Sequence, residues 1–412
     1  MRKTITLLTA FAGLQAFAGG FQLNVQSVRA VGMGGAFTGF ARAASSVFFN
    51  PAGLTNISGH QFMFGGNLVF PKVSLQTAAN DNINQTSGLS TPIHFYYGGQ
   101  ITDKLFVGFG VNNPFGSSSS FADDWDGRYI VQNISLKTFC FQPSMAYKLH
   151  DKLSLGAGFS LTTGSFSFEK AVPVSSSTTD YGKASLSGSG IGYGYNVGLF
   201  ANNLIDSDKL KLDLGIDFRS GQSIQLDNGT AQFTNTPPSL TTTFPSETNF
   251  SGGLNLPYVL STGLAIDYAL NESSKLTLVY DLNLTGWSSY DTLAFDFENE
   301  DTPDSKTPKN WENSFTHRVG LEYAFNDMIF VRGGLYYDIT PIPDGFVSPE
   351  LPDATQLVPT LGFGVKLAEA FTFDLSWIHQ NTTRSASLDD AGFSADYHRI
   401  ADVVSFSVSY TF

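Results

Sequence analysis

The sequence predicts an all-β fold: a 14-stranded antiparallel transmembrane β-barrel with an N-terminal plug in its lumen. Only 14% of the 412 residues are charged, against about 25% in ordinary soluble domains, while aromatic residues also reach 14%. Segments of about ten residues alternate between apolar and polar side chains, as the strands of membrane barrels do. Beyond the first 18 residues, no apolar run approaches the length of about 20 residues that a membrane-spanning helix needs.

Charge and motifs exclude several classes of function. A formal net charge of −13 argues against nucleic acid as a partner, because phosphate binding needs clustered Lys and Arg. The single cysteine, Cys140, rules out an internal disulfide framework and a cysteine zinc cluster. The sequence has neither a Gly-x-Ser-x-Gly elbow nor a His-Glu-x-x-His pair, so we expect no enzyme, cofactor or metal site. A catalytic site assembled from separate strands is the weaker alternative.

Residues 1–18 are expected to form a secretory signal peptide. Arg2 and Lys3 give a positive start, residues 5–17 form an apolar run, and Ala16-Phe17-Ala18 has the small–x–small pattern of a cleavage site. Cleavage after Ala18 would make Gly19 the first residue of the mature chain. The apolar run is too short to span a bilayer. A buried N-terminal helix is the alternative interpretation.

Residues 19–59 are expected to form a plug, or hatch, inside the barrel lumen. They are rich in Gly and Ala and contain Pro51, which breaks any strand ladder. Fourteen strands enclose a lumen wider than wall side chains can fill, since eight strands already give a packed interior. Phe37, Phe48 and Phe49 would be costly to leave in water, which disfavours the alternative of a disordered periplasmic tail.

Residues 60–412 are expected to form the barrel wall. At the C-terminus, Val404, Phe406 and Val408 alternate with serines, which gives one apolar and one hydroxylic face. Short polar turns alternate with longer polar loops, as expected when the turns face the periplasm and the loops face outside. The predicted strands are 60–76, 91–101, 104–115, 128–149, 153–170, 184–205, 209–226, 248–270, 275–296, 311–325, 328–340, 355–367, 370–384 and 397–412. Because a Lys or Arg that faces lipid costs about 2–4 kcal/mol, five strand charges should face the lumen: Lys211, Asp213, Asp217, Arg219 and Asp281.

Short motifs follow one another in a fixed order over residues 19–160: Gly20-Phe21-Gln22-Leu23-Asn24, Gly32-Met33-Gly34-Gly35-Ala36-Phe37, Asn50-Pro51-Ala52-Gly53-Leu54, Val111-Asn112-Asn113-Pro114-Phe115-Gly116, Trp125-Asp126-Gly127-Arg128-Tyr129 and Pro143-Ser144-Met145-Ala146-Tyr147-Lys148. Together they resemble the FadL family of outer-membrane long-chain fatty-acid transporters, whose relatives carry aromatic hydrocarbons such as toluene. The resemblance implies a monomeric fourteen-stranded barrel, closed by an N-terminal hatch, in the outer membrane of a Gram-negative bacterium.

The resemblance also implies a transport route. In the family a hydrophobic ligand binds in a groove between extracellular loops and then in a lumenal pocket beside the N-terminus. It leaves sideways into outer-membrane lipid through a kink in the third strand. We therefore expect a transporter for hydrophobic small molecules, long-chain fatty acids or aromatic hydrocarbons; a surface-binding barrel (an adhesin or receptor) with a closed lumen is the alternative. The terminal Phe412 resembles the signal that the barrel-assembly machinery reads, or it is an interfacial aromatic.

The expected gate lies in the third strand. Gly108 and Gly110 fall within it, where missing side chains weaken pairing and permit a bend. By resemblance to the hatch motif of the family, Asn50 should satisfy exposed backbone there, with Pro51 and Ala52 filling the gap. The alternative is that these glycines are ordinary bends of the barrel.

The expected ligand contacts are aromatic and basic. Phe21 and Leu23 match the family's N-terminal segment beside the ligand, and Phe115, Phe121 and Trp125 are candidates for the external groove. Trp125 could equally be an interfacial aromatic. Arg219 and Arg332 are lumenal candidates for holding a carboxylate, although lumenal charges more often form structural pairs.

Overall fold

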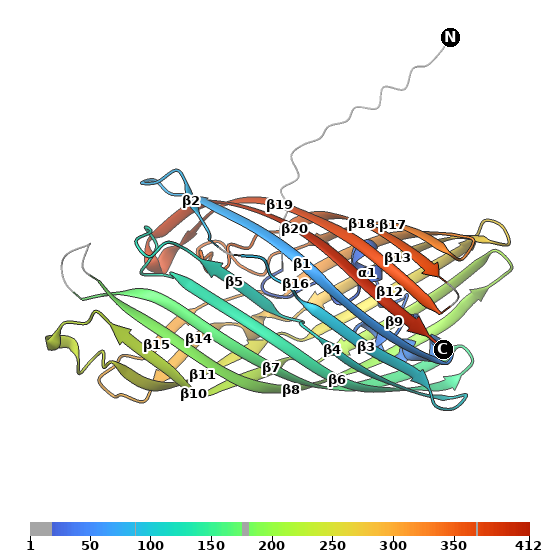
Figure 1. The fold of residues 1–412 in the computed structure, drawn as a ribbon, viewed down its shortest axis with the longest axis horizontal. Helices are drawn as coiled ribbons and strands as arrows, with labels where there is room; N and C mark the ends of the chain where they lie inside the picture. The colour runs from blue at the N-terminus through green and yellow to red at the C-terminus, as the bar shows by residue number, and fades with distance from the viewer. Residues whose placement is uncertain (1–18, 87, 175–180, 368–369) are drawn as a thin grey trace, which may run out of the picture.

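The computed structural model describes residues 19–86, 88–174, 181–367 and 370–412, and its strands close into an antiparallel β-barrel (Figure 1). The last strand, β20 (Phe393–Thr411), pairs with the first, β1 (His60–Gln76), in one continuous register. Both chain ends of the wall therefore meet at a single antiparallel seam, which completes the cylinder.

The wall has fourteen strands within the described residues, so the predicted number is confirmed. Five of the fourteen are interrupted and carry two labels each, and β2 (Ile83–Asn84) is a short addition to β1. Between β1 and β20 the wall consists of β3 (Ile93–Gln100), β4 (Leu105–Asn112) with β5 (Gly116–Ser120), β6 (Asn133–His150), β7 (Leu153–Pro173), β8 (Tyr181–Asp206), β9 (Leu210–Arg219) with β10 (Gln222–Thr234), β11 (Glu247–Leu256) with β12 (Val259–Ala269), β13 (Ser274–Thr285) with β14 (Thr292–Phe297), β15 (Ser305–Pro308) with β16 (Ser314–Phe325), β17 (Ile329–Asp338), β18 (Gln356–Leu367) and β19 (Phe371–Leu388). The short 3₁₀ turns η2 (Pro238–Leu240), η3 (Trp287–Ser289) and η4 (Asp389–Ala391) lie between strands.

The two faces of the wall differ in polarity, because successive strand residues point to opposite sides. In β20, Ser405 and Ser407 are buried toward the lumen, whereas Phe406 is 49% exposed on the outer surface. Four of the five charges expected to face the lumen are buried: Asp213, Asp217, Arg219 and Asp281. Among the described residues, no helix has the length and apolar character needed to cross a membrane.

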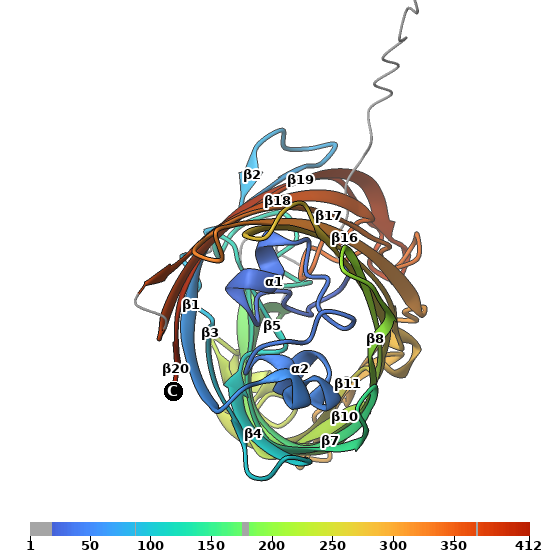
Figure 2. The same ribbon diagram turned by 90° about the vertical axis from the view of Figure 1, so that its right-hand side faces the viewer.

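The N-terminal residues are folded inside the barrel. Figure 2 shows α1 (Val28–Gly32) and α2 (Ser46–Phe49) within the ring of strands. η1 (Pro51–Asn56) follows α2 and packs against β6, β7 and β8. We call residues 19–26 the N-terminal strand and residues 27–59 the lumenal body. Apolar side chains of the lumenal body form one buried cluster with the wall, among them Met33, Phe37, Phe40, Val47, Leu54, Tyr96 and Phe106.

Candidate functional site

The third wall strand is interrupted between β4 and β5, at Asn113, Pro114 and Phe115. β4 pairs with β3 on one side and with β6 on the other, whereas β5 pairs with β6 alone among the described strands. Pro114 contributes to the break, because it has no N–H to donate to a ladder. One edge of the third strand is therefore left without a neighbouring wall strand.

The N-terminal strand pairs with this interruption from the lumen. Leu23 N donates to Pro114 O at 2.9 Å, and Gly116 N donates to Phe21 O at 2.9 Å. These are the two bonds of a short antiparallel ladder. The beginning of the described chain thus takes the place of the missing neighbour of the third strand.

Polar side chains satisfy the rest of the interruption. Asn113 Oδ1 accepts the backbone N–H of Ile93 at 2.9 Å, and its Nδ2 donates to Thr138 O at 2.5 Å. The Thr138 hydroxyl accepts the N–H of Phe115 at 3.1 Å and donates to its carbonyl at 2.6 Å. Because side chains bind these backbone groups, the wall can be broken here without leaving them unpaired.

Phe21 projects from the N-terminal strand into an aromatic cluster. Its ring centroid lies 4.8 Å from Trp287, 5.3 Å from Tyr290 and 5.7 Å from Trp311. Beside this cluster is a small pocket. Its lining is mainly apolar and includes Ile134, Leu136, Phe166, Leu254, Ile342 and Leu351. We call it the apolar pocket.

One ion pair lies in the wall of the apolar pocket. Lys309 Nζ is 2.5 Å from Glu350 Oε2, and the two side chains are only 7% and 12% exposed. Lys309 is the only cation among the described residues that line the pocket. Since Glu350 neutralises it, the pocket offers a ligand one polar point and no large unpaired charge.

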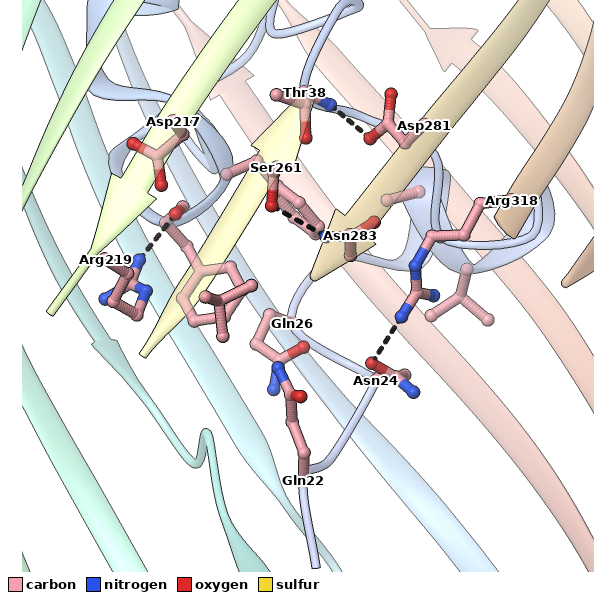
Figure 3. Close-up of a pocket in the computed structure, with 16 residues that line it drawn as sticks. Gln22, Asn24, Gln26, Thr38, Asp217, Arg219, Ser261, Asp281, Asn283 and Arg318 are labelled. Carbon is pink, nitrogen blue, oxygen red and sulfur yellow. Dashed lines mark hydrogen bonds between the residues drawn. The ribbon is translucent and has the colours of Figure 1, made fainter. Parts of the chain in front are cut away.

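A second, polar pocket lies on the other side of the N-terminal strand (Figure 3). Gln22 and Asn24 of the N-terminal strand line it, whereas Phe21 lines the apolar pocket. Arg318 donates to Asn24 Oδ1 at 2.9 Å, while Arg219 and Asp281 bond to neutral groups of the lumenal body and wall. The N-terminal strand therefore separates an apolar chamber from a polar one, and Arg219 faces the polar one.

Arg332 was expected from the sequence to hold a ligand carboxylate, but in the structure it binds two carboxylates of the wall. Its Nε donates to Glu322 at 2.6 Å, its Nη1 donates to Asp374 at 2.6 Å, and the side chain is 1% exposed. Glu322 also receives Arg29 of α1 at 2.6 Å. The structure thus assigns Arg332 to the attachment of α1 to the wall, because both carboxylates already occupy its donors.

Three residues expected at the third strand lie elsewhere: Asn50, Pro51 and Ala52. Asn50 Nδ2 donates to Leu199 O of β8 at 3.1 Å and to Ile216 O of β9 at 3.4 Å. Ala52 lies directly over Gly156 of β7, where any side chain would collide with it. Asn50 and Ala52 are therefore held by β7, β8 and β9, and Gly156 of β7 permits the close approach.

Gly108 and Gly110 also differ from their expected role. Both lie within β4, and the ladders to β3 and β6 run through them without a break. A Cβ atom at Gly108 would lie 2.5 Å from Val47 Cγ2, and one at Gly110 would lie 2.9 Å from Tyr96 and Val47. These glycines make room for α2, whereas the interruption of the strand begins at Asn113.

The aromatic residues expected in an external groove form part of the core. Phe121 and Trp125 stack at 4.1 Å, and Trp125 Nε1 donates to Val131 O at 2.6 Å. Phe115 lies 5.9 Å from Phe21, and all four aromatic residues belong to one buried cluster. Leu23 packs near Gly116 beside the interruption. Of the expected ligand contacts, only Phe21 lines the apolar pocket.

Several residues of this site were not identified from the sequence. Trp287 and Tyr290 lie in and beside η3, inside a region predicted as one continuous strand. The only available signal was the Gly286-Trp287 pair, since glycine inside a strand pattern marks a bend. Lys309 lies in the interruption between β15 and β16, and Glu350 lies in the loop between β17 and β18, so their spacing in the sequence does not indicate that they meet.

These features define a class: an outer-membrane β-barrel whose lumen holds its own N-terminal segment beside an apolar pocket. The chain belongs to the outer membrane protein transport protein family (OMPP1/FadL/TodX), whose model matches residues 9–412. The resemblance seen in the sequence is confirmed. The protein is accordingly an outer-membrane transporter of hydrophobic compounds from a Gram-negative bacterium, and not an enzyme.

Relatives in sequence agree with the family, and solved structures agree with the fold. A putative outer membrane protein of Neisseria meningitidis is 25% identical, over 100% of this chain and 99% of its own length. A long-chain fatty acid transport protein of Escherichia coli O6:H1 is 24% identical, over 92% of this chain and 91% of its own. A FadL homologue of Pseudomonas aeruginosa has the same fold, with a TM-score of 0.81 at 17% identity, covering 96% of this chain and 100% of that one. The toluene transporter TodX of Pseudomonas putida gives 0.69 at 15% identity, covering 97% and 99%.

Proposed function

We propose that the protein takes hydrophobic small molecules from outside the cell into the apolar pocket and releases them sideways into outer-membrane lipid. The N-terminal strand is the part that moves, and the lumenal body is a hatch that stays closed during release. Long-chain fatty acids are the first substrate class and aromatic hydrocarbons the second. The protein acts as a monomer, and its terminal Phe412 serves recognition by the barrel-assembly machinery.

One observation carries this proposal: the N-terminal strand contacts both the pocket and the interrupted wall. The Phe21 side chain borders the apolar pocket, while the Phe21 and Leu23 backbones pair with the third strand. Displacing this one segment would open pocket and wall together. The wall backbone would lose the two ladder bonds and the bond from Gln26 Nε2 to Asn113 O, while the Asn113 and Thr138 side chains keep other neighbouring groups satisfied. An opening toward lipid requires such satisfaction, because no water is present there to replace lost bonds.

A sideways route suits an oily substrate. Each CH₂ group left in water costs about 0.8 kcal/mol, so passage from an apolar pocket directly into lipid avoids exposure of the chain. Relatives named long-chain fatty acid transport proteins and structures named toluene transporters support both substrate classes. The Lys309–Glu350 pair would respond differently to the two substrate classes. The carboxylate of a fatty acid would compete with Glu350 for Lys309, whereas a hydrocarbon would not.

The alternative function is a barrel that binds a surface partner with its long loops while the lumen stays shut. Uptake of labelled oleate and of toluene by cells with and without the protein distinguishes the two. Uptake that is the same in both strains for every apolar compound would support the alternative.

A reversible lock on the N-terminal strand tests the proposed route. Gln22 and Phe115 face each other between the two ladder bonds, as a non-hydrogen-bonded antiparallel pair. Such pairs have Cα atoms about 4.5 Å apart, which suits a disulfide. In a Cys140→Ser background, we expect Gln22→Cys/Phe115→Cys to lose uptake when oxidised and to recover it when reduced.

A second lock provides the matched control. Val47→Cys/Gly108→Cys would join the lumenal body to β4, where a Cβ at Gly108 lies 2.5 Å from Val47 Cγ2. Because the lumenal body is proposed to stay in place, oxidation of this second cysteine pair should leave uptake unchanged. Full uptake through the oxidised N-terminal lock would contradict the sideways route.

A further inference from the structure

The backbone nitrogens at the start of the N-terminal strand lie beside two carboxylates. Gly19 N is 2.9 Å from Asp338 Oδ2, at the end of β17. Gly20 N is 3.2 Å from Asp353 Oδ2, in the loop between β17 and β18. The end of β17 and the loop that follows it therefore converge on the first two residues of this strand.

Both carboxylates are buried, and neither forms an ion pair with a described residue. Asp338 is 3% exposed and Asp353 is fully buried, and Asp353 Oδ1 has no hydrogen-bond partner. The positive charge of Arg318 influences Asp338, and that of Arg399 influences Asp353, but both arginines lie beyond ion-pair distance. Burial raises the pKa of Asp353 to about 7. Desolvated acids of this kind are stabilised by a cation in direct contact, and no described side chain supplies one within ion-pair distance.

The site is shaped for the glycines at this end of the chain. A Cβ atom at Gly19 would lie 2.9 Å from Asp338 Oδ1. Gly20 has a φ of +67°, and a Cβ atom there would lie 2.6 Å from Trp287 and 2.8 Å from Trp311. A side chain at either position would push the backbone nitrogens away from the carboxylates, so the fit depends on the bare backbone.

We propose that Asp338 and Asp353 form a binding site for the α-ammonium group that removal of residues 1–18 creates at Gly19. Hydrolysis of the Ala18–Gly19 bond by a signal peptidase consumes one water, leaves a carboxylate on Ala18 and leaves an amine on Gly19, which takes up a proton. In the precursor the same nitrogen is an uncharged amide with one hydrogen. Processing therefore supplies the charge that the two carboxylates lack.

This ion pair anchors the N-terminal strand two residues before it pairs with the third wall strand. Removal of the leader would then fix the register in which Phe21 and Leu23 close the interruption. That consequence depends on the proposed function, whereas the ammonium site itself does not. The reactivity of the α-amine tests the ammonium site without measuring transport, so the ammonium site and the proposed function can fail independently.

The reactivity of the α-amine tests the site in the native protein. Two carboxylates raise the pKa of an ammonium above the value of about 7.7–8.0 for a free chain terminus, whereas burial alone lowers it. Acetylation of the purified mature barrel in detergent, followed over pH by mass spectrometry of the N-terminal peptide, should give a pKa about one unit higher. At neutral pH the α-amine would then react about tenfold more slowly than a free terminus. A pKa at or below that of a free terminus would overturn the proposal, as would a mature chain that does not begin at Gly19.

Variants test the two carboxylates directly. Asp338→Asn/Asp353→Asn keeps the side-chain shapes and removes the charges, so the α-amine should react about tenfold faster. Asp344→Asn is the matched control, because its side chain is 91% exposed and lies in the same loop as Asp353. Migration of the unheated barrel in SDS gels reports that each variant is folded. Equal protection in the folded double variant would overturn the proposal, and if that variant does not fold, the pH titration of the native protein decides.

Discussion

The N-terminal strand and the lumenal body are held inside the same barrel by different kinds of contact. The N-terminal strand is held by two ladder bonds, by aromatic contacts of Phe21 and by hydrogen bonds to carboxylates at its first residues. The lumenal body is held by buried ion pairs: Arg29 contacts Glu322, and Arg42 contacts Asp213 and Asp267. It also lies close to the wall backbone at several glycines.

The difference indicates which segment can move at low cost. Backbone hydrogen bonds contribute about 0.5–1.5 kcal/mol each, so a few of them can open transiently. Breaking a buried ion pair costs about 3–5 kcal/mol, because it leaves an uncompensated charge. We therefore expect opening to displace residues 21–26, which lie between the anchored Gly19 and the lumenal body, and to leave residues 27–59 in place, and three substitutions test that division.

Arg332→Met should have the largest effect, and the effect should be on stability. The substitution leaves Glu322 and Asp374 buried without one of their cations, at a cost of about 3–5 kcal/mol. Urea unfolding of the detergent-solubilised barrel measures it. Lys306→Met is the control, because Lys306 is 64% exposed and should change stability little. A strong change in substrate preference with unchanged stability would restore Arg332 as a ligand contact.

The contacts of Arg332 also show how much of the structure could be predicted from the sequence. The strand pattern and the number of strands were predictable, because alternation such as that of Val404 to Val408 is local. The role of Arg332 was not, because it depends on Glu322 of β16 and Asp374 of β19, two other strands of the wall.

The predicted gate shows the same limit of prediction from the sequence. Glycines in the third strand suggested a bend at Gly108, but a glycine in the sequence does not reveal that Val47 fills the space beside it. Pro114 carried the useful signal, since its missing N–H coincides with the interruption. The partner of that interruption, the backbone of Phe21 and Leu23, lies more than 90 positions away in the sequence and meets it only when the barrel closes.

Phe21→Glu should have the next largest effect, and the effect should be on ligand binding. The substitution removes a buried aromatic ring worth about 1.5–3 kcal/mol and places a carboxylate in the apolar pocket. We expect retention of labelled oleate by the purified barrel to fall at least about tenfold, while the barrel stays folded. Phe21→Leu is the control and should retain most of the binding. Undiminished binding by Phe21→Glu would show that the N-terminal strand does not contribute to ligand binding in the pocket.

Gly108→Ala should have the smallest effect, and it distinguishes a packing role from a gating role. The added methyl group meets Val47 Cγ2 at 2.5 Å and Leu54 Cδ1 at 3.0 Å, so the lumenal body must shift slightly. Such overpacking costs about 1 kcal/mol, and it should lower stability in urea while leaving uptake unchanged. Gly333→Ala is the control, because a Cβ atom there has nothing within 4 Å. If Gly108→Ala instead slows uptake at unchanged stability, the gate extends down β4 and the lumenal body takes part in opening.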